Sequence, residues 1–212
     1  MTDAWSERAE LYRTSAAHSA GPDLDLIVEW GAGCATAIDV ATGGGHVARR
    51  LREAGIEVVS CDPAPGMRAD VICFAEELPF ADAAFGLAVT RVAAHHFADV
   101  AEAIRELARV ASARVIVVDN LFGGADTERA EKLRDPSHVR TYTEAEWRDF
   151  FARAGIEIEE VRSFDFPVEL EPWLARTGCE GEEAAQVRDL LADRVVGAQV
   201  AFERIAILGR PG

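Results

Sequence analysis

The sequence has few basic residues, and it has almost no lysine. Its 212 residues include 22 Lys and Arg against 37 Asp and Glu, which gives a formal net charge of −15. Lys132 is the only lysine, which excludes a Walker-type lysine at a phosphate loop and a Tyr-x-x-x-Lys dehydrogenase dyad. So large an acidic excess repels a phosphate backbone, and we expect no nucleic-acid partner.

Other signatures are also missing. There is no Gly-x-Ser-x-Gly, so a hydrolase nucleophile elbow is excluded. The start of the chain does not resemble a signal peptide, and no apolar run approaches the ~20 residues that span a bilayer. We therefore expect a cytoplasmic protein without a membrane segment. No C-x-x-C joins the four cysteines, which we interpret as reduced structural residues; they are Cys34, Cys61, Cys73 and Cys179.

The pattern of apolar residues predicts alternating strands and helices. Strands are expected at Thr36–Val40, Glu57–Cys61, Val71–Phe74, Gly86–Thr90, Arg114–Asp119, Ile156–Phe164 and Val200–Leu208. Helices are expected at His46–Glu53, Ala98–Val110, Glu144–Ala154, Pro172–Arg176 and Gly181–Arg194. This order predicts an α/β fold with a doubly wound, mostly parallel seven-stranded sheet. We expect one domain over residues 1–212, with a helical lid at 1–30 and an αβα core at 31–212.

The most informative segment is Ala37-Ile-Asp-Val-Ala-Thr-Gly-Gly-Gly-His-Val-Ala48, where a carboxylate closes an apolar run just before three glycines. The pattern predicts a strand, a tight loop and a helix. Glycine tolerates positive φ and lets a ligand lie against the backbone, while the helix N-terminus presents free N–H groups. Such a loop suits a nucleotide-like cofactor.

Two cofactor classes fit this loop. Gly43-x-Gly45-x-x-Ala48 satisfies the relaxed dinucleotide fingerprint, and Asp62 follows at the end of the next strand. The carboxylate of Asp39, however, would repel a pyrophosphate and attract an ammonium group. S-adenosylmethionine carries that ammonium, and its ribose hydroxyls suit Asp62. It is therefore the better candidate.

The order Asp39-x-Ala41-x-Gly43-x-Gly45, followed by Asp62, resembles the motif of the class I methyltransferases, with Ala41 replacing the first glycine. Glu77-Leu-Pro-Phe-Ala-Asp82 and Arg91-Val-Ala-Ala-His-His-Phe-Ala-Asp99 extend the resemblance to the type 11 group, relatives of the ubiquinone and menaquinone biosynthesis enzymes. The resemblance implies methyl transfer from S-adenosylmethionine to a small-molecule acceptor, and an antiparallel last strand at the edge of the sheet. The resemblance is compatible with a homodimer but does not require one.

The resemblance also implies the residues of the cofactor site. Most of them follow the carboxyl ends of strands, where doubly wound sheets bind ligands, and Tyr12 would close over the cofactor from the N-terminal lid. The expected residues are Tyr12, Asp39, Ala41, Thr42, Gly43, Gly44, Gly45, Asp62, Pro63, Phe74, Ala75, Glu76 and Arg91. No metal site is expected.

Two adjacent histidines follow the strand at Gly86–Thr90, where the methyl acceptor should approach. A histidine titrates near neutral pH and could take a proton from the acceptor. Our candidate for this base is His95, with Asp119 orienting it. The alternative for either histidine is a hydrogen-bonded packing role.

Two departures from the family concern the adenine side. Only residues 63–70 separate Asp62 from the next expected strand, fewer than the ~10–12 residues of a helical crossover. Phe74 also stands where the family generally has an aspartate that bonds the adenine. We therefore expect an adenine side that is open and apolar. The alternative function is a non-catalytic protein that kept the fold, because fold alone does not determine activity.

Overall fold

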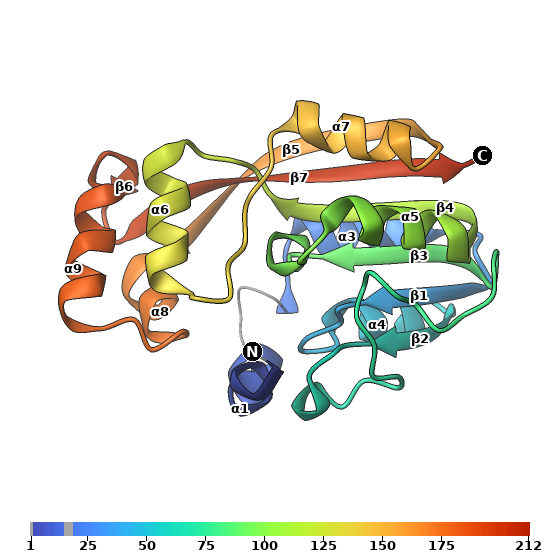
Figure 1. The fold of residues 1–212 in the computed structure, drawn as a ribbon, viewed down its shortest axis with the longest axis horizontal. Helices are drawn as coiled ribbons and strands as arrows, with labels where there is room; N and C mark the ends of the chain where they lie inside the picture. Colours follow the sequence, from blue (N-terminus) through green and yellow to red (C-terminus); the bar gives the residue numbers. More distant parts are fainter. Residues whose placement is uncertain (1, 15–18) are drawn as a thin grey trace.

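The computed structural model describes residues 2–14 and 19–212 (Figure 1). Its helices are α1 (Thr2–Arg13), α3 (Pro22–Gly31), α4 (His46–Glu53), α5 (Val100–Val110), α6 (Ala125–Arg134), α7 (Glu144–Arg153), α8 (Leu170–Ala175) and α9 (Gly181–Leu190). Its strands are β1 (Thr36–Val40), β2 (Glu57–Cys61), β3 (Phe85–Arg91), β4 (Ala111–Asn120), β5 (Ile156–Glu169), β6 (Val195–Val196) and β7 (Gln199–Pro211). Three 3₁₀ turns are η1 (Pro65–Met67), η2 (Ala94–His96) and η3 (Ala192–Arg194).

The seven strands form one mixed sheet in the order β2-β1-β3-β4-β7-β5, with β6 paired to β7. Strands β1 to β4 are parallel to one another, and β7 is antiparallel to β4 and to β5. The predicted fold class is thereby confirmed. The last strand lies between β4 and β5 instead of at the edge, because β5 pairs with it over its whole length, from Ile156–Pro211 to Glu169–Gln199.

The strand expected at Val71–Phe74 does not form, and that prediction was wrong. The segment makes one isolated bridge, from Val71 to Cys61, before it leaves the sheet. The link from β2 is too short for a crossover helix and contains only the turn η1. Without a helix to cover them, the side chains of Ile72 and Phe74 stay 62% and 57% exposed. The seventh strand is the short β6.

Helix α6 was not predicted from the sequence, for a clear reason. It has no continuous apolar face, and its buried residues are Thr127, Ala130 and Glu131. It packs against α9, so tertiary contact and not periodicity stabilises it.

Helices cover both faces of the sheet (Figure 1). On one face α3 and α4 bury Leu24, Ile27 and Leu51 against strand residues such as Leu87 and Ile116. On the opposite face α5 and α7 bury residues that include Ile104, Leu107, Trp147 and Phe151. These two layers hold the carboxyl ends of β1, β2 and β3 in fixed positions.

A second, smaller core lies at the far end of β5 and β7, where both strands extend beyond the sheet (Figure 1). Helices α6, α8 and α9 pack there around Trp173, Leu174 and Val187. Of the helices α1 and α3, which lie within the lid expected at residues 1–30, α3 belongs to the main core, whereas α1 packs against η1. Residues 15–18 of the expected lid lie outside the described part of the chain.

Candidate functional site

A cavity of about 620 Å³ opens at the carboxyl ends of β1, β2 and β3, beside α1. It is lined by Trp5, Tyr12, Asp39, Ala41, Thr42, Gly43, Gly44, His46, Val47, Asp62, Pro63, Met67, Phe74, Ala75, Glu76, Glu77, Arg91, Val92, Ala93, His96, Phe97 and Ala98. Every residue that we expected at the cofactor site is among them except Gly45, which is the N-cap of α4. The volume is typical of a small-molecule site.

The loop after β1 has backbone conformations that favour glycine, even at Ala41. Ala41 has a φ of 56°, and Gly43 has a φ of 51°. Gly44 is required for another reason, because a Cβ at this position would lie 2.8 Å from the carbonyl oxygen of Tyr12. This glycine therefore lets α1 approach the loop.

Asp39 fixes the start of α4, and its pKa lies near neutral pH. Its Oδ2 accepts hydrogen bonds from the backbone N–H of Ala48, at 3.0 Å, and from the hydroxyl of Thr42. Burial raises the pKa of Asp39 to about 6, although these hydrogen bonds oppose the shift. A cation placed beside this carboxylate would favour its charged form.

Asp62 ties the loop to the end of β2. One carboxylate oxygen accepts from the N–H of Gly43 and the other from the N–H of Ala64, both at 2.9 Å. Burial raises the pKa of this carboxyl, and the two hydrogen bonds lower it. The side chain thus sits between the glycine loop and the segment after β2, and it lines the cavity.

The segment at residues 74–77 forms the outer wall. Phe74 lines the cavity while 57% of it is exposed, so this side of the cavity is open to solvent. Glu76 has a structural contact as well, because its Oε1 accepts from the N–H of Ala98 at 2.8 Å and of Asp99 at 3.2 Å, just before α5. These bonds join the wall to the start of that helix.

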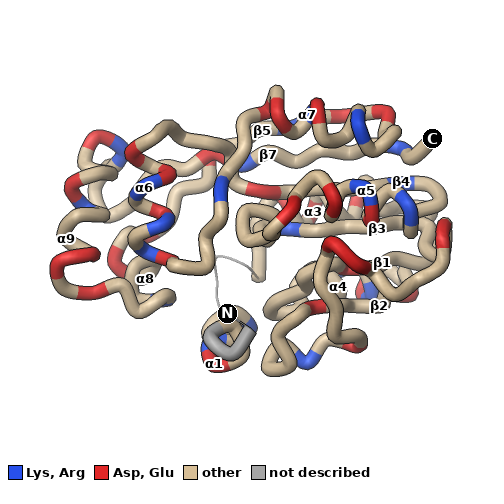
Figure 2. The backbone as a smooth tube through the Cα atoms, viewed as in Figure 1, with Lys and Arg blue, Asp and Glu red and all other residues tan. Residues whose placement is uncertain are grey.

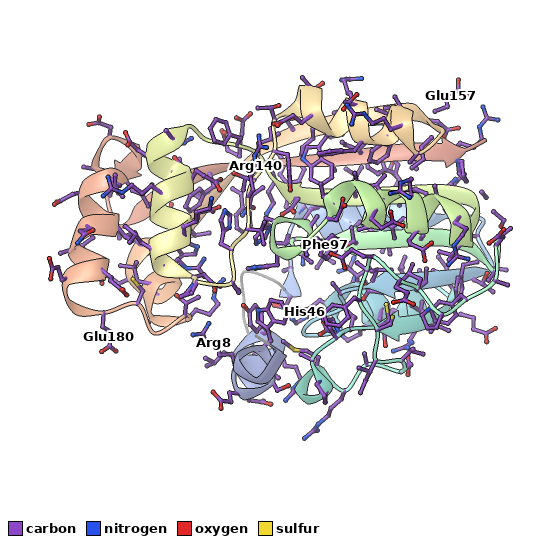
Figure 3. All side chains as sticks on the ribbon, in the orientation of Figure 1. Arg8, His46, Phe97, Arg140, Glu157 and Glu180 are labelled. Atoms are coloured by element: carbon purple, nitrogen blue, oxygen red, sulfur yellow. The ribbon has the colours of Figure 1, made fainter. Side chains whose placement is uncertain are left out.

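Helix α1 closes the opposite side with Trp5 and Tyr12. The Nε2 of His46 lies 3.0 Å from the carbonyl oxygen of Tyr12; since a carbonyl only accepts, this nitrogen donates. Figure 3 labels His46, beside α1, and Phe97, which lines the cavity from the other side after η2. Sequence reasoning missed Trp5 and His46, although His46 directly follows the three glycines.

Arg91, at the end of β3, is part of a buried charge network. Its Nε donates to Oδ2 of Asp23, in α3, at 2.6 Å, and Nη1 of Arg204, in β7, donates to the same oxygen at 3.1 Å. The Arg204 guanidinium also lies 3.2 Å above the centre of the Phe166 ring. One carboxylate therefore joins α3, β3 and β7 behind the cavity.

The two adjacent histidines have different environments. His95 is bonded to Asp119 through its Nδ1, at 2.6 Å, and through its backbone N–H, at 2.8 Å. Burial alone would lower the pKa of His95, but the Asp119 carboxylate raises it above its ordinary value. Neither His95 nor Asp119 lines the cavity, whereas His96 does.

Other kinds of site find no support in the described residues. Residues 2–14 and 19–212 contain no group of three His, Cys, Asp or Glu side chains placed to hold a metal ion. Among these residues no helix combines the length and the apolar character needed to cross a bilayer. All four cysteines are free thiols.

Comparison with known proteins agrees with this geometry. Residues 38–118 match the type 11 family described as a methyltransferase domain. The uncharacterized methyltransferase YcgJ of Bacillus subtilis is 29% identical, over 86% of this chain and 82% of its own length. The uncharacterized protein YafE of Escherichia coli is 37% identical over 49% of this chain and 53% of its own.

Solved structures share the fold. The Bacillus halodurans protein BH2331 superposes with a TM-score of 0.79 and 27% identity, covering 90% of this chain and 99% of that one. The structure of YcgJ gives a TM-score of 0.80 at 24% identity, covering 89% and 97%. Residues 38–118 therefore match a methyltransferase domain, and over most of its length the chain is similar to proteins named as methyltransferases.

Proposed function

We propose that this enzyme transfers the methyl group of S-adenosylmethionine to a small molecule bound in the cavity beside α1. The observation that carries the proposal is one cavity whose lining brings together Asp39, the glycine loop, Asp62 and His96. When bound, the cofactor supplies an electrophilic methyl group on a sulfonium. The task of the protein is to position the two reactants and to exclude water.

The lining residues fit the parts of this cofactor. Asp39 offers a buried carboxylate for the amino-acid ammonium, and Asp62 offers carboxylate oxygens at the end of β2 for the ribose hydroxyls. Phe74 offers an aromatic face for the adenine. Tyr12 and Trp5 close the site from α1.

Charge and shape favour a small acceptor over a nucleic acid. The net charge is −15, and Figure 2 shows acidic positions along α7 and α9 with basic positions interspersed among them. A phosphate backbone would be repelled by this distribution. The cavity is also bordered by α1, which leaves room for a compact molecule.

Transfer of a labelled methyl group tests this function. Purified protein is incubated with [methyl-¹³C]S-adenosylmethionine and a cell lysate, and the label is measured in the small-molecule, protein and nucleic-acid fractions. We expect the label in the small-molecule fraction. Label in a macromolecular fraction, or no enzyme-dependent transfer, would overturn the proposal.

Asp62→Ala should weaken the binding of S-adenosylhomocysteine by about 1.5–3 kcal/mol, roughly 10- to 150-fold, because a charge-assisted hydrogen bond is lost. Isothermal titration calorimetry measures this change. Asp70→Ala is the matched control, since Asp70 bonds Ser60 outside the cavity. Equal affinities for the two variants would place the ribose elsewhere.

The adenine side should discriminate poorly between bases, since a contact with Phe74 is apolar and stacking tolerates changes in the base. We expect S-adenosylhomocysteine and its inosine analogue to bind with similar affinity. Phe74→Asp should restore preference for adenine, because a hydrogen-bonded site rejects a ligand that lacks the donor. Much weaker binding of the inosine analogue by the parent protein would contradict an apolar contact between the base and Phe74.

A further inference from the structure

The hydrogen bonds around His96 define which of its ring nitrogens carries the proton. Its Nδ1 lies 3.0 Å from the carbonyl oxygen of Ser137 and 3.1 Å from the hydroxyl oxygen of the same residue. A carbonyl oxygen can only accept. The hydroxyl of Ser137 donates to Asp135 at 2.7 Å and receives the indole N–H of Trp5 at 3.2 Å, so it too acts as an acceptor toward His96. Nδ1 therefore carries the hydrogen.

The opposite ring nitrogen is left for a ligand. With the hydrogen on Nδ1, the Nε2 of a neutral imidazole has a lone pair and only accepts. No described residue hydrogen-bonds to this atom. The atom is also not among the buried side-chain atoms of the described chain, so a ligand can reach it. Because His96 lines the cavity, its Nε2 is a hydrogen-bond acceptor available to a ligand there, as are the carboxylates of Glu76 and Glu77, whereas His95 is held by Asp119.

We propose that the methyl acceptor is an apolar compound with a nucleophilic hydroxyl group, and that His96 Nε2 receives its proton during transfer. This proposal rests on the function proposed above. As the hydroxyl oxygen forms its bond to the methyl carbon, the bond from that carbon to sulfur breaks, and sulfur leaves as a neutral thioether. The hydroxyl proton passes to His96, and the imidazolium then releases it to water. Trp5 and Phe97 line the cavity with His96 and suit an apolar acceptor.

The apolar side chains of Trp5 and Phe97 beside His96 favour an uncharged hydroxyl over the ammonium that an amine carries near neutral pH, because burying a charge is costly. The weak basicity of His96 agrees with this choice. Burial, and next the neighbouring His95, lower the pKa of His96 to about 3, while Asp135 and Asp119 oppose the shift. His138 is the other titratable ring nearby, with its centroid 6.3 Å away. A hydroxyl that is being methylated becomes a much stronger acid than an imidazolium, so even a weak base can take its proton. A methylated amine is a weaker acid and would keep its proton, and a carbon acid needs a stronger base.

The tautomer of the His96 ring can be tested without a methyl acceptor. Nitrogen NMR of protein labelled with ¹⁵N in the histidine rings should show His96 neutral at neutral pH, with hydrogen on Nδ1, both free and bound to S-adenosylhomocysteine. His96→Ala identifies the resonances. A charged ring, or hydrogen on Nε2, would overturn the proposal.

The acceptor atom is tested by the carbon NMR shift of a transferred label. Protein, [methyl-¹³C]S-adenosylmethionine and a small-molecule cell extract should give an enzyme-dependent signal of a methyl group on oxygen. A methyl group on nitrogen, sulfur or carbon would overturn the hydroxyl assignment and leave the proposed function intact. The absence of label from every small molecule would instead contradict the proposed function.

The role of His96 is tested by measuring the rate at which the same labelled methyl group is transferred. His96→Ala should lower the transfer rate ~10²-fold or more, keep the affinity for S-adenosylhomocysteine, and recover part of its rate when imidazole is added. Full activity of His96→Ala would show that the acceptor needs no base at this position. A loss of cofactor affinity equal to the loss of rate would assign His96 to packing.

Discussion

Asp23→Ala is expected to lower the free energy of unfolding by about 3–5 kcal/mol, because it leaves two buried guanidinium groups without their shared carboxylate. The side chain of Asp23 is 0% exposed, and those of Arg91 and Arg204 are 4% and 3% exposed. Water therefore cannot replace the lost partner without opening the core. Urea unfolding followed by circular dichroism measures the change.

Asp25→Ala is a matched control on the same helix. Asp25 also pairs with an arginine, Arg50, at 2.6 Å, but its side chain is 72% exposed. Solvent screens such a pair, and its loss should change stability by less than about 1 kcal/mol. Similar values for the two variants would mean that the network at Asp23 contributes little. Because Arg91 lines the cavity, Asp23→Ala should also weaken cofactor binding.

Asp119→Ala should destabilise the fold by a similar amount, about 3–5 kcal/mol, because it breaks a buried pair. The Asp119 carboxylate accepts from the ring and the backbone of His95 and from the N–H of Asn120. Its loss leaves these donors without an acceptor and releases the turn η2, which carries His96. Stability by urea unfolding and the rate of methyl transfer should therefore both fall.

The difference in stability between the parent protein and Asp119→Ala should depend on pH, because the pKa values of His95 and Asp119 are both shifted. The pKa of His95 is raised above its ordinary 6.5, mainly by Asp119 against the effect of burial, so its contribution is lost as the pH rises through the raised value. The pKa of Asp119 is lowered below its ordinary 3.8, since His95 and the hydrogen bonds outweigh burial, so its contribution is lost at lower pH. The gap in stability between parent and variant should therefore be largest between pH 3.8 and 6.5. A gap that does not vary with pH would show that the pair is not ionic.

Where sequence prediction failed, local pattern and tertiary structure disagreed. The residues 71–74 have the apolar pattern of a strand, but the short link after Asp62 does not let them continue along β2. Helix α6 has no apolar stripe and depends on its contact with α9. In both places the outcome depends on what the segment meets in three dimensions.

Local patterns in the sequence predict the class of fold, the glycine loop and the cofactor. These depend on short-range regularities: alternating strands and helices, a carboxylate at a strand end, and glycines where the backbone turns. The expected cofactor residues other than Gly45 line one cavity, because parallel strands bring their carboxyl ends to the same edge of a sheet. Ala41 itself has a φ of 56°, a conformation that favours glycine.

Tertiary packing sets which groups meet in and around that cavity. The carboxylate of Asp23 meets Arg204 across 181 positions of the sequence, and α1 brings Trp5 to Ser137. The choice between His95 and His96 is of the same kind, since adjacent residues of a 3₁₀ turn point in different directions. Packing turns His95 toward Asp119 and His96 toward the cavity, and no periodicity in the sequence encodes that orientation.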